Sequence, residues 1–132
     1  MTQKDKELLL KDLCARLDTN LVCSIYRTDD EGVGYRDEIL HGYCKGDIWY
    51  EFYFREDCSI GIDNVSKIKP YLFPLSSMTD EQEKEYNNLN CYELGCFPHS
   101  EEALDYLTKN HFDYRGLIEK GLALDATGLG IY

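Results

Sequence analysis

Residues 69–86, KPYLFPLSSMTDEQEKEY, join two kinds of structure and decide how the chain is organised. Pro70 and Pro74 fix their own φ angles and bias the residue before each of them away from helix. Thr79 and Gln82 have the spacing of a capping box, which marks the start of a helix. The segment between these signals is too apolar for a free loop and contains Tyr71, Leu72, Phe73 and Leu75. The pattern predicts a fixed joint whose apolar cluster is buried between a sheet and C-terminal helices.

The first half of the chain predicts one helix and then a run of strands. Residues 4–18 are predicted to be helical because apolar side chains recur at helical spacing along one stripe. The stripe consists of Leu10, Leu13, Cys14 and Leu17. Residues 21–62 hold short apolar runs between turns rich in Asp and Gly, a pattern typical of an antiparallel meander. In the clearest strand, residues 48–54, aromatic and aliphatic side chains alternate with Trp49, Glu51 and Tyr53.

Residues 63–132 are expected to hold the joint and a helical C-terminal part. The capping box predicts a helix over residues 79–88, and Ser100 is placed to cap a second helix with acids in its first turn. Residues 112–120 favour one more helical turn. We therefore expect a single α+β domain over residues 1–132. Its centre is a small antiparallel, SH3-like partly closed barrel or a curved sheet of four to five strands, with N- and C-terminal helices.

The composition is strongly acidic. The chain has 132 residues, with 14 Lys and Arg against 25 Asp and Glu, so its formal net charge is −11. This charge disfavours direct nucleic-acid binding, in which Lys and Arg neutralise phosphates, and it also disfavours anionic membrane surfaces. The opening, MTQKDKELLLKDL, lacks a signal-peptide core, and no run of 18 apolar residues exists. We expect a cytoplasmic protein whose six cysteines are reduced thiols.

Three stretches carry a resemblance to a known group of proteins. They are KPYLFPLSSMT at residues 69–79, HFDYRGLI at residues 111–118 and LLLKDLCARL at residues 8–17. In these stretches the chain resembles an uncharacterised family of small proteins encoded by prophages and mobile elements of gut bacteria. The family has no established activity, so the resemblance implies a mobile-element origin and no catalytic residue. Residues 87–99 depart from the family's pattern and are interpreted as a local insertion.

Cys91, Cys96 and His99 are the best candidates for a metal site. A structural zinc ion needs four ligands in a tetrahedral arrangement, and His111 is the candidate for the fourth. The spacing C-x4-C-x2-H-x11-H matches no strong zinc-finger pattern, and a loop with incidental thiols explains the same residues. We therefore expect no cofactor and keep a small structural zinc-binding protein as one alternative.

The sequence contains no evident catalytic constellation, so we expect a protein that is not an enzyme. Nucleophilic catalysis needs a Cys or Ser beside a His and an orienting acid, and no nucleophile-elbow motif is present. Adjacent carboxylates such as Asp29 and Asp30 are explained by a solvated turn. Gly32 and Gly34 are not followed by a helix, as a phosphate-binding loop requires.

Two sets of residues are candidates for binding a protein partner. Trp49 and Tyr53 lie on the face of their strand opposite the apolar row. Asp113, Tyr114 and Arg115 are adjacent in the HFDYRGLI stretch, and Tyr and Arg are favoured anchors at interfaces. The structural alternative is that Arg115 pairs with Asp113 or caps carbonyls, while the apolar residues around them fill the core.

These observations predict a non-enzymatic protein-interaction module with a protein partner. The alternative is an acidic mimic, which inhibits a nucleic-acid-binding host protein by placing carboxylates where phosphates bind. Residues 79–102 favour this alternative because they hold seven acids and one Lys. An acidic face can meet a basic partner, and ordinary solubility charge explains the same residues.

Overall fold

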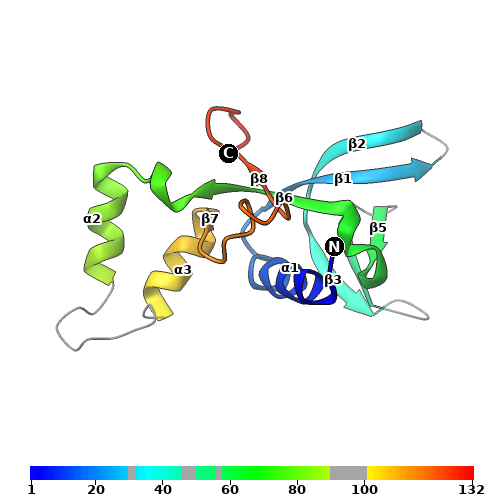
Figure 1. Ribbon diagram of the computed structural model, residues 1–132, viewed down its shortest axis with the longest axis horizontal. Helices are drawn as coiled ribbons and strands as arrows, with labels where there is room; N and C mark the ends of the chain where they lie inside the picture. Colours follow the sequence, from blue (N-terminus) through cyan, green and yellow to red (C-terminus); the bar gives the residue numbers. More distant parts are fainter. Residues whose placement is uncertain (30–31, 46–49, 56–57, 90–100) are drawn as a thin grey trace.

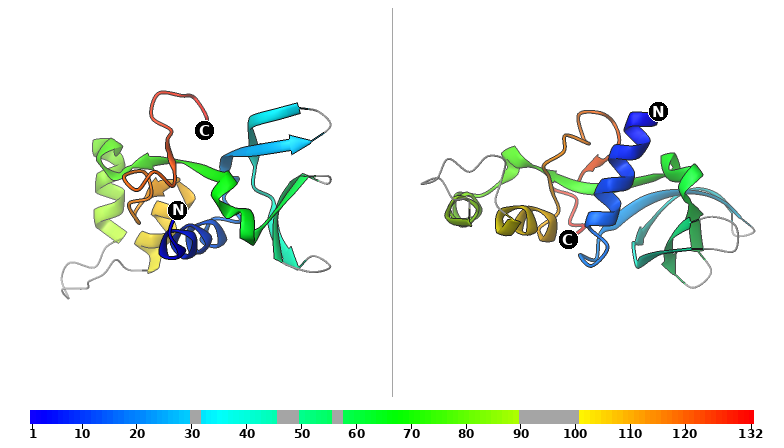
Figure 2. Two further views of the ribbon diagram at one scale, coloured as in Figure 1. Left: turned by 45° about the vertical axis from the view of Figure 1, so that its right-hand side comes forward. Right: turned by 90° about the horizontal axis from the view of Figure 1, so that it is seen from below.

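The computed structural model describes residues 1–29, 32–45, 50–55, 58–89 and 101–132. Strand β6 (Ile68–Pro74) runs along the length of the molecule (Figure 1). The sheets lie toward one end, and the helices α2 (Asp80–Leu89) and α3 (Glu101–Lys109) lie together at the other end (Figures 1 and 2). Helix α1 (Gln3–Ala15) occupies the middle, below β6 in the view of Figure 1.

Helix α1 begins at Gln3 because Thr2 caps it. The Thr2 hydroxyl accepts a hydrogen bond from the Asp5 N–H at 3.1 Å, and the Asp5 carboxylate accepts one from the Thr2 N–H at 3.1 Å, which completes a capping box. The helix ends at Ala15, before the predicted residue 18. Its buried stripe lies one position earlier than predicted, so that Cys14 is exposed. The buried residues are Leu9, Asp12 and Leu13.

The remaining strands are short. Their bounds are β1 Val22–Asp29, β2 Gly32–Ile39, β3 Gly42–Lys45, β4 Tyr50–Arg55, β5 Cys58–Gly61, β7 Phe112–Asp113 and β8 Leu124–Asp125. The larger sheet has the order β2-β1-β6-β7, and β8 also pairs with β6. The smaller sheet has the order β3-β4-β5. Two 3-10 helices, η1 (Ile62–Lys67) and η2 (Leu75–Ser77), precede and follow β6.

Strand β6 connects distant parts of the chain. It pairs antiparallel with β1, where Pro70 lies opposite Cys23, and parallel with β7 and β8. The neighbouring pairs β1–β2, β3–β4 and β4–β5 are antiparallel, as expected for a meander. The N-terminal hairpin and the C-terminal segment therefore both pair with β6, which lies between them.

The α+β class is confirmed, and the strands form two sheets, one of five and one of three strands, where one sheet of four to five strands was expected. Eight strands occur in the described residues, in two sheets that stay mostly open and do not close into a barrel. The joint proposed from the two prolines is strand β6. The expected helical turn at residues 112–120 begins as β7 instead. Strands of two residues have too few positions for an alternating pattern, so β7 and β8 have no signature in the sequence.

The second capping box is confirmed. The Thr79 N–H donates to the Gln82 side-chain oxygen at 3.0 Å, and the Gln82 N–H donates to the Thr79 hydroxyl at 3.2 Å. Helix α2 consequently begins at Asp80. The second predicted helix is α3, and its predicted cap, Ser100, lies outside the described residues.

The inward positions of β6 enter the core formed by α1, both sheets and the C-terminal segment. They are Ile68, Pro70 and Leu72, which alternate with half-buried neighbours. Leu72 is completely buried and Phe73 is half-buried, but the side chain of Leu75 is 42% exposed. The predicted burial of the apolar cluster is therefore right for Leu72 and wrong for Leu75, which lies beyond the strand.

Leu72→Ala is expected to lower the free energy of unfolding by about 2–5 kcal/mol, because it removes a fully buried side chain and leaves a cavity. Leu75→Ala removes the same atoms from an exposed position and serves as the matched control, with an expected change within about 0.5 kcal/mol. Urea unfolding followed by circular dichroism measures both. Equal losses in the two variants would show that β6 is not the inward strand described here.

Candidate functional site

The HFDYRGLI stretch is tied to α1 by a buried ion cluster. The carboxylate of Asp12 accepts hydrogen bonds from Nε of Arg16 at 2.9 Å and from Nε of Arg115 at 3.1 Å. The side chains of Asp12 and Arg16 are fully buried, and that of Arg115 is largely buried. Two guanidinium groups therefore share one carboxylate in the interior, with charge-assisted hydrogen bonds on both oxygens.

Arg16 also reaches the C-terminal part of the chain. Its Nη2 donates to the Phe112 carbonyl at 2.6 Å, and its Nη1 lies 3.5 Å from the Thr108 carbonyl. Thr108 lies near the end of α3, and Phe112 is the first residue of β7. The Arg16 guanidinium therefore binds one carbonyl at the end of a helix and one at the start of a strand. These contacts position α3 and β7 against α1.

Tyr114 and Asp113 complete the cluster. The guanidinium carbons of Arg16 and Arg115 both lie over the Tyr114 ring, at 5.2 Å and 4.7 Å from its centroid, as in cation–π contacts. The Asp113 carboxylate accepts hydrogen bonds from the N–H groups of Leu117 and Ile118, both at 2.9 Å. Arg115 therefore pairs with α1 and not with Asp113, and all three candidate residues make internal contacts that favour the structural alternative.

Asp12→Asn is expected to lower the free energy of unfolding by about 3–5 kcal/mol, because it leaves two largely or fully buried guanidinium groups without a counter-charge. Asp18→Asn makes the same chemical change at an exposed position and is the control. Thermal or urea unfolding measures both variants. A loss at Asp12 no larger than at Asp18 would mean that water or another group neutralises the cluster.

The first pair of candidate residues is only partly described. Trp49 lies outside the described residues. Tyr53 is partly exposed on β4, and its ring covers Gly42 of β3, since a Cβ atom added at Gly42 would lie 2.8 Å from the Tyr53 hydroxyl. The aromatic ring therefore fills the space left by a glycine on the neighbouring strand and lies against the sheet.

The candidate zinc ligands Cys91, Cys96 and His99 also lie outside the described residues. Of that set only His111 is described, and it is buried between α3 and β7. The described part of the chain contains no group of three or more side chains able to hold a metal ion. No disulfide links its four cysteines, Cys14, Cys23, Cys44 and Cys58, to one another.

His111 also lines a cavity of about 420 Å³ that the sequence did not predict. It lies where β6, α3, β7 and the C-terminal turn come together. The side chains and backbone that line it are Phe73, Ser77, Gln82, Lys109, Asn110, His111, Phe112, Thr127, Gly128 and Tyr132. No single stretch of sequence predicts it, because its walls come from three separate stretches, residues 73–82, 109–112 and 127–132. Among its residues only His111 had been a candidate.

His111 combines several unusual properties in this cavity. Its side chain is 8% exposed, and its backbone has φ 63°, a left-handed conformation that is uncommon outside Gly. Its ring stacks on Tyr132 with centroids 3.8 Å apart and planes 11° apart. Nδ1 is fully buried and has no hydrogen-bond partner among the described residues. Burial and the nearby Arg16 cation lower the pKa of His111 to about 4, so the ring is neutral near pH 7.

Tyr132, which stacks on His111 in the cavity, is hydrogen-bonded to two strands of the larger sheet. Its hydroxyl accepts a hydrogen bond from the Val22 N–H at 3.0 Å and donates to the Tyr71 carbonyl at 2.8 Å. The hydroxyl therefore bridges β1 and β6 just beyond the last paired residue, Cys23. Burial raises the pKa of Tyr132, so the hydroxyl stays protonated and able to donate.

Comparison with protein-family models, with curated proteins and with solved structures found no match. None of the helices in the described residues combines the length and the apolar character needed to cross a membrane.

The buried His111 is expected to make stability depend on pH. An unfolded His binds a proton below about pH 6.5, whereas the folded one does so only below about 4. Between these values the unfolded chain holds the extra proton, so the free energy of unfolding falls as the pH falls. The contribution of His111 is fully present above about pH 6.5 and decreases by about 2 kcal/mol by pH 5, at about 1.4 kcal/mol per pH unit.

His111→Asn tests this dependence, because Asn tolerates the left-handed backbone and does not titrate. Both proteins are unfolded in urea near pH 7 and near pH 5. The carboxylates that they share contribute equally to the change in their unfolding free energies, so this contribution cancels when the two changes are compared. The wild type should lose more stability than the variant over this interval. Parallel losses would show that His111 is protonated as easily in the folded chain as in the unfolded one.

Proposed function

We propose that this chain is a non-enzymatic protein-binding module that takes up an extended, basic peptide along the outer edge of β2. The observation that supports it best is the position of β2, which pairs with β1 alone and is an edge strand of its sheet within the described residues. An unpaired strand edge offers a row of backbone N–H and C=O groups, and extended peptides bind by adding a strand to such an edge.

Exposed apolar side chains accompany this edge. Val33 is 73% exposed and Tyr35 is 68% exposed, and Ile39 lies on the same face of β2. Tyr35 packs edge-on against Tyr26 of β1, with ring centroids 5.2 Å apart. The β1–β2 hairpin projects from the rest of the molecule (Figures 1 and 2), so a strand can approach from outside. Alternating apolar side chains on an added strand would meet this face.

The charge of the hairpin favours a basic partner. Residues 22–39 contain five acidic and two basic residues, within a chain of net charge −11. Complementary charge speeds encounter and disfavours acidic partners. The carboxylate of Asp37 lies on the exposed face beside Tyr35 and accepts a hydrogen bond from the Tyr71 hydroxyl at 2.9 Å. It is therefore held in place on the surface that the peptide would cover.

The proposal also covers the SH3-like fold and the cellular location of the protein. We propose that the two sheets, although mostly open, correspond to the two parts of an SH3-like fold, since β1 pairs with β6 and the chain passes from β2 into β3 of the other sheet within two residues. We place the protein in the cytoplasm, as a product of a mobile element. The absence of a disulfide among the four described cysteines suits a reducing compartment.

The test is selection of peptides from a displayed random library on the full chain. Enriched peptides are expected to alternate apolar and basic residues. The double variant Val33→Lys, Tyr35→Lys should weaken their binding by about tenfold or more, because it removes two apolar contacts and repels a basic peptide. Hydrogen exchange of the β2 amides should slow when the peptide is bound.

The matched control is the double variant Leu75→Lys, Leu129→Lys, which replaces two exposed apolar residues outside β2 with the same charges. It should keep most of the affinity of the wild type. The proposal is overturned if both double variants bind equally weakly, if no peptide is enriched, or if the chain turns over a small molecule in an activity screen.

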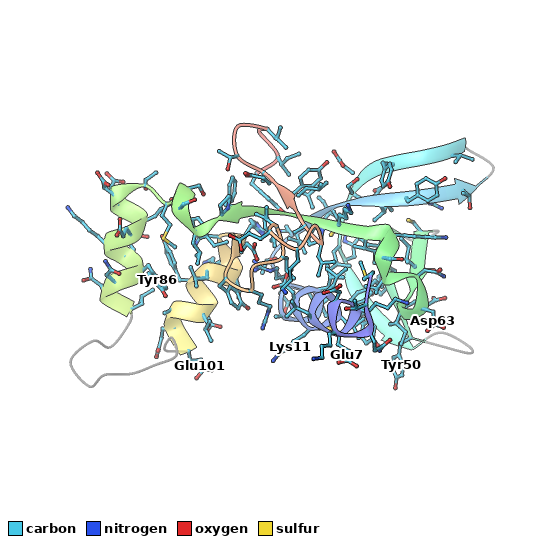
Figure 3. The ribbon with its side chains drawn as sticks, in the orientation of Figure 1. Glu7, Lys11, Tyr50, Asp63, Tyr86 and Glu101 are labelled. Carbon is cyan, nitrogen blue, oxygen red and sulfur yellow. The ribbon has the colours of Figure 1, made fainter. Side chains whose placement is uncertain are left out.

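The second proposal is the acidic mimic, and it is based on the exposed acidic side chains of α2 and α3. The two helices lie together and expose Asp80, Glu81, Glu83, Glu85, Glu101, Glu102 and Asp105. Glu101 lies at the outer end of α3 (Figure 3). Lys84 interrupts the acids of α2, which weakens the resemblance to a row of phosphates. Competition between this chain and duplex DNA for a basic host protein distinguishes the mimic from a β2-edge binder, since only the mimic is insensitive to the Val33 and Tyr35 changes.

A further inference from the structure

We propose that the cavity around His111 binds a small aromatic carboxylate. The cavity is separate from the β2 edge, because it lies beyond β6 at the opposite side of the larger sheet. Its volume of about 420 Å³ lies within the range of small-molecule sites, which combine apolar walls with a few polar groups. The walls of this cavity indicate an aromatic ring in the ligand, and its polar groups indicate a carboxylate.

The walls are aromatic. Phe73 occupies their centre, with its ring centroid 6.1 Å from that of Phe112 and 5.8 Å from that of Tyr132. Tyr132 in turn stacks on His111. Aromatic rings attract other rings in offset-stacked or edge-to-face arrangements. Phe73 is half-buried and Tyr132 is 43% exposed, so both rings can contact a ligand ring, and a planar aromatic body fits this space.

Two of the polar groups, those of His111 and Lys109, are hydrogen-bond donors, while the hydroxyl and amide groups of Ser77, Gln82, Asn110 and Thr127 can donate or accept. Nδ1 of His111 is sealed from solvent and lacks an acceptor among the described residues, so the proton of the neutral ring belongs on the other nitrogen, Nε2, where it does not leave a buried N–H unpaired. Lys109 is the one charged side chain among the described residues of the lining, and it is exposed at the rim. A neutral N–H donor and an ammonium group together match a carboxylate.

The strained backbone of His111 is consistent with a binding role. A non-Gly residue with positive φ persists only when its surroundings hold it. Here the His111 carbonyl accepts a hydrogen bond from the Phe73 N–H at 2.8 Å, and its own N–H donates to the Thr108 carbonyl at 3.2 Å. These contacts fix the imidazole against Tyr132 before any ligand arrives, and so reduce the ordering needed for binding.

The experiment is an amide NMR titration of the full chain with indole-3-acetate and benzoate, and with benzamide as the uncharged counterpart of benzoate. The carboxylates are expected to shift the amides of Phe73, Lys109, His111 and Gly128. Benzamide should bind about tenfold more weakly, since charged groups strengthen a hydrogen bond by about that factor. Equal binding of benzamide and benzoate, or shifts that avoid these amides, would overturn the proposal.

Two variants test the polar groups separately. Lys109→Gln removes an exposed charge without touching the core and should weaken carboxylate binding about threefold to tenfold, while Lys120→Gln, an exposed charge outside the cavity lining, should leave it unchanged. His111→Asn removes the ring and should abolish the shifts, with a thermal melt to establish that the variant is folded. If Lys109→Gln and Lys120→Gln bind alike and a folded His111→Asn variant still binds, the cavity does not recognise carboxylates.

Discussion

The carboxylate of Asp12 is the single contact on which the arrangement of the chain depends. It lies completely buried between Arg16, one helical turn away, and Arg115, from the other end of the chain. A charge in the interior is tolerated only with its partners in place, so α1 and the HFDYRGLI stretch become buried together. Arg16 then holds the carbonyls of Thr108 and Phe112, and β7, which starts at Phe112, pairs with β6. A buried ion cluster of this kind selects one arrangement among several hydrophobic ones, although it adds little to stability compared with apolar packing.

Local signals in the sequence were reliable where the physics is local. The capping box of Thr79 and Gln82 predicted the start of α2 because both partners lie within one helical turn. The buried stripe of α1 was displaced by one position, because Asp12 and Arg16 are charged and a hydrophobicity pattern excludes them. The strand character of β6 was hidden by Pro70 and Pro74, since proline within a run argues against a strand. The cavity around His111 was not predictable, because its walls come from segments that meet only in the folded chain.

The two proposed binding surfaces lie on opposite edges of one sheet and share a structural element. The outer edge of β2 faces away from the body, whereas the cavity lies beside β7. Tyr132 lines the cavity and its hydroxyl bonds Val22, the first residue of β1, which pairs with Ile39 of β2. The strand that supports the peptide edge is thus anchored by a side chain of the cavity wall. Function on either edge therefore requires the same strand pairing to be complete.

The position of β6 has a consequence for how the chain acquires its structure during synthesis. Residues 68–74 pair with residues 23–25 on one side and with residues 112–113 and 124–125 on the other. The earlier half emerges first from the ribosome, and contacts between residues far apart in sequence form slowly because a long loop must close first. Asp12 and Arg16 can meet each other at once, but the Phe112 carbonyl lies 96 residues after Arg16, and Arg115 lies 103 residues after Asp12. The ion cluster and the pairing of β6 with β7 and β8 can therefore be completed only after these later residues have been made.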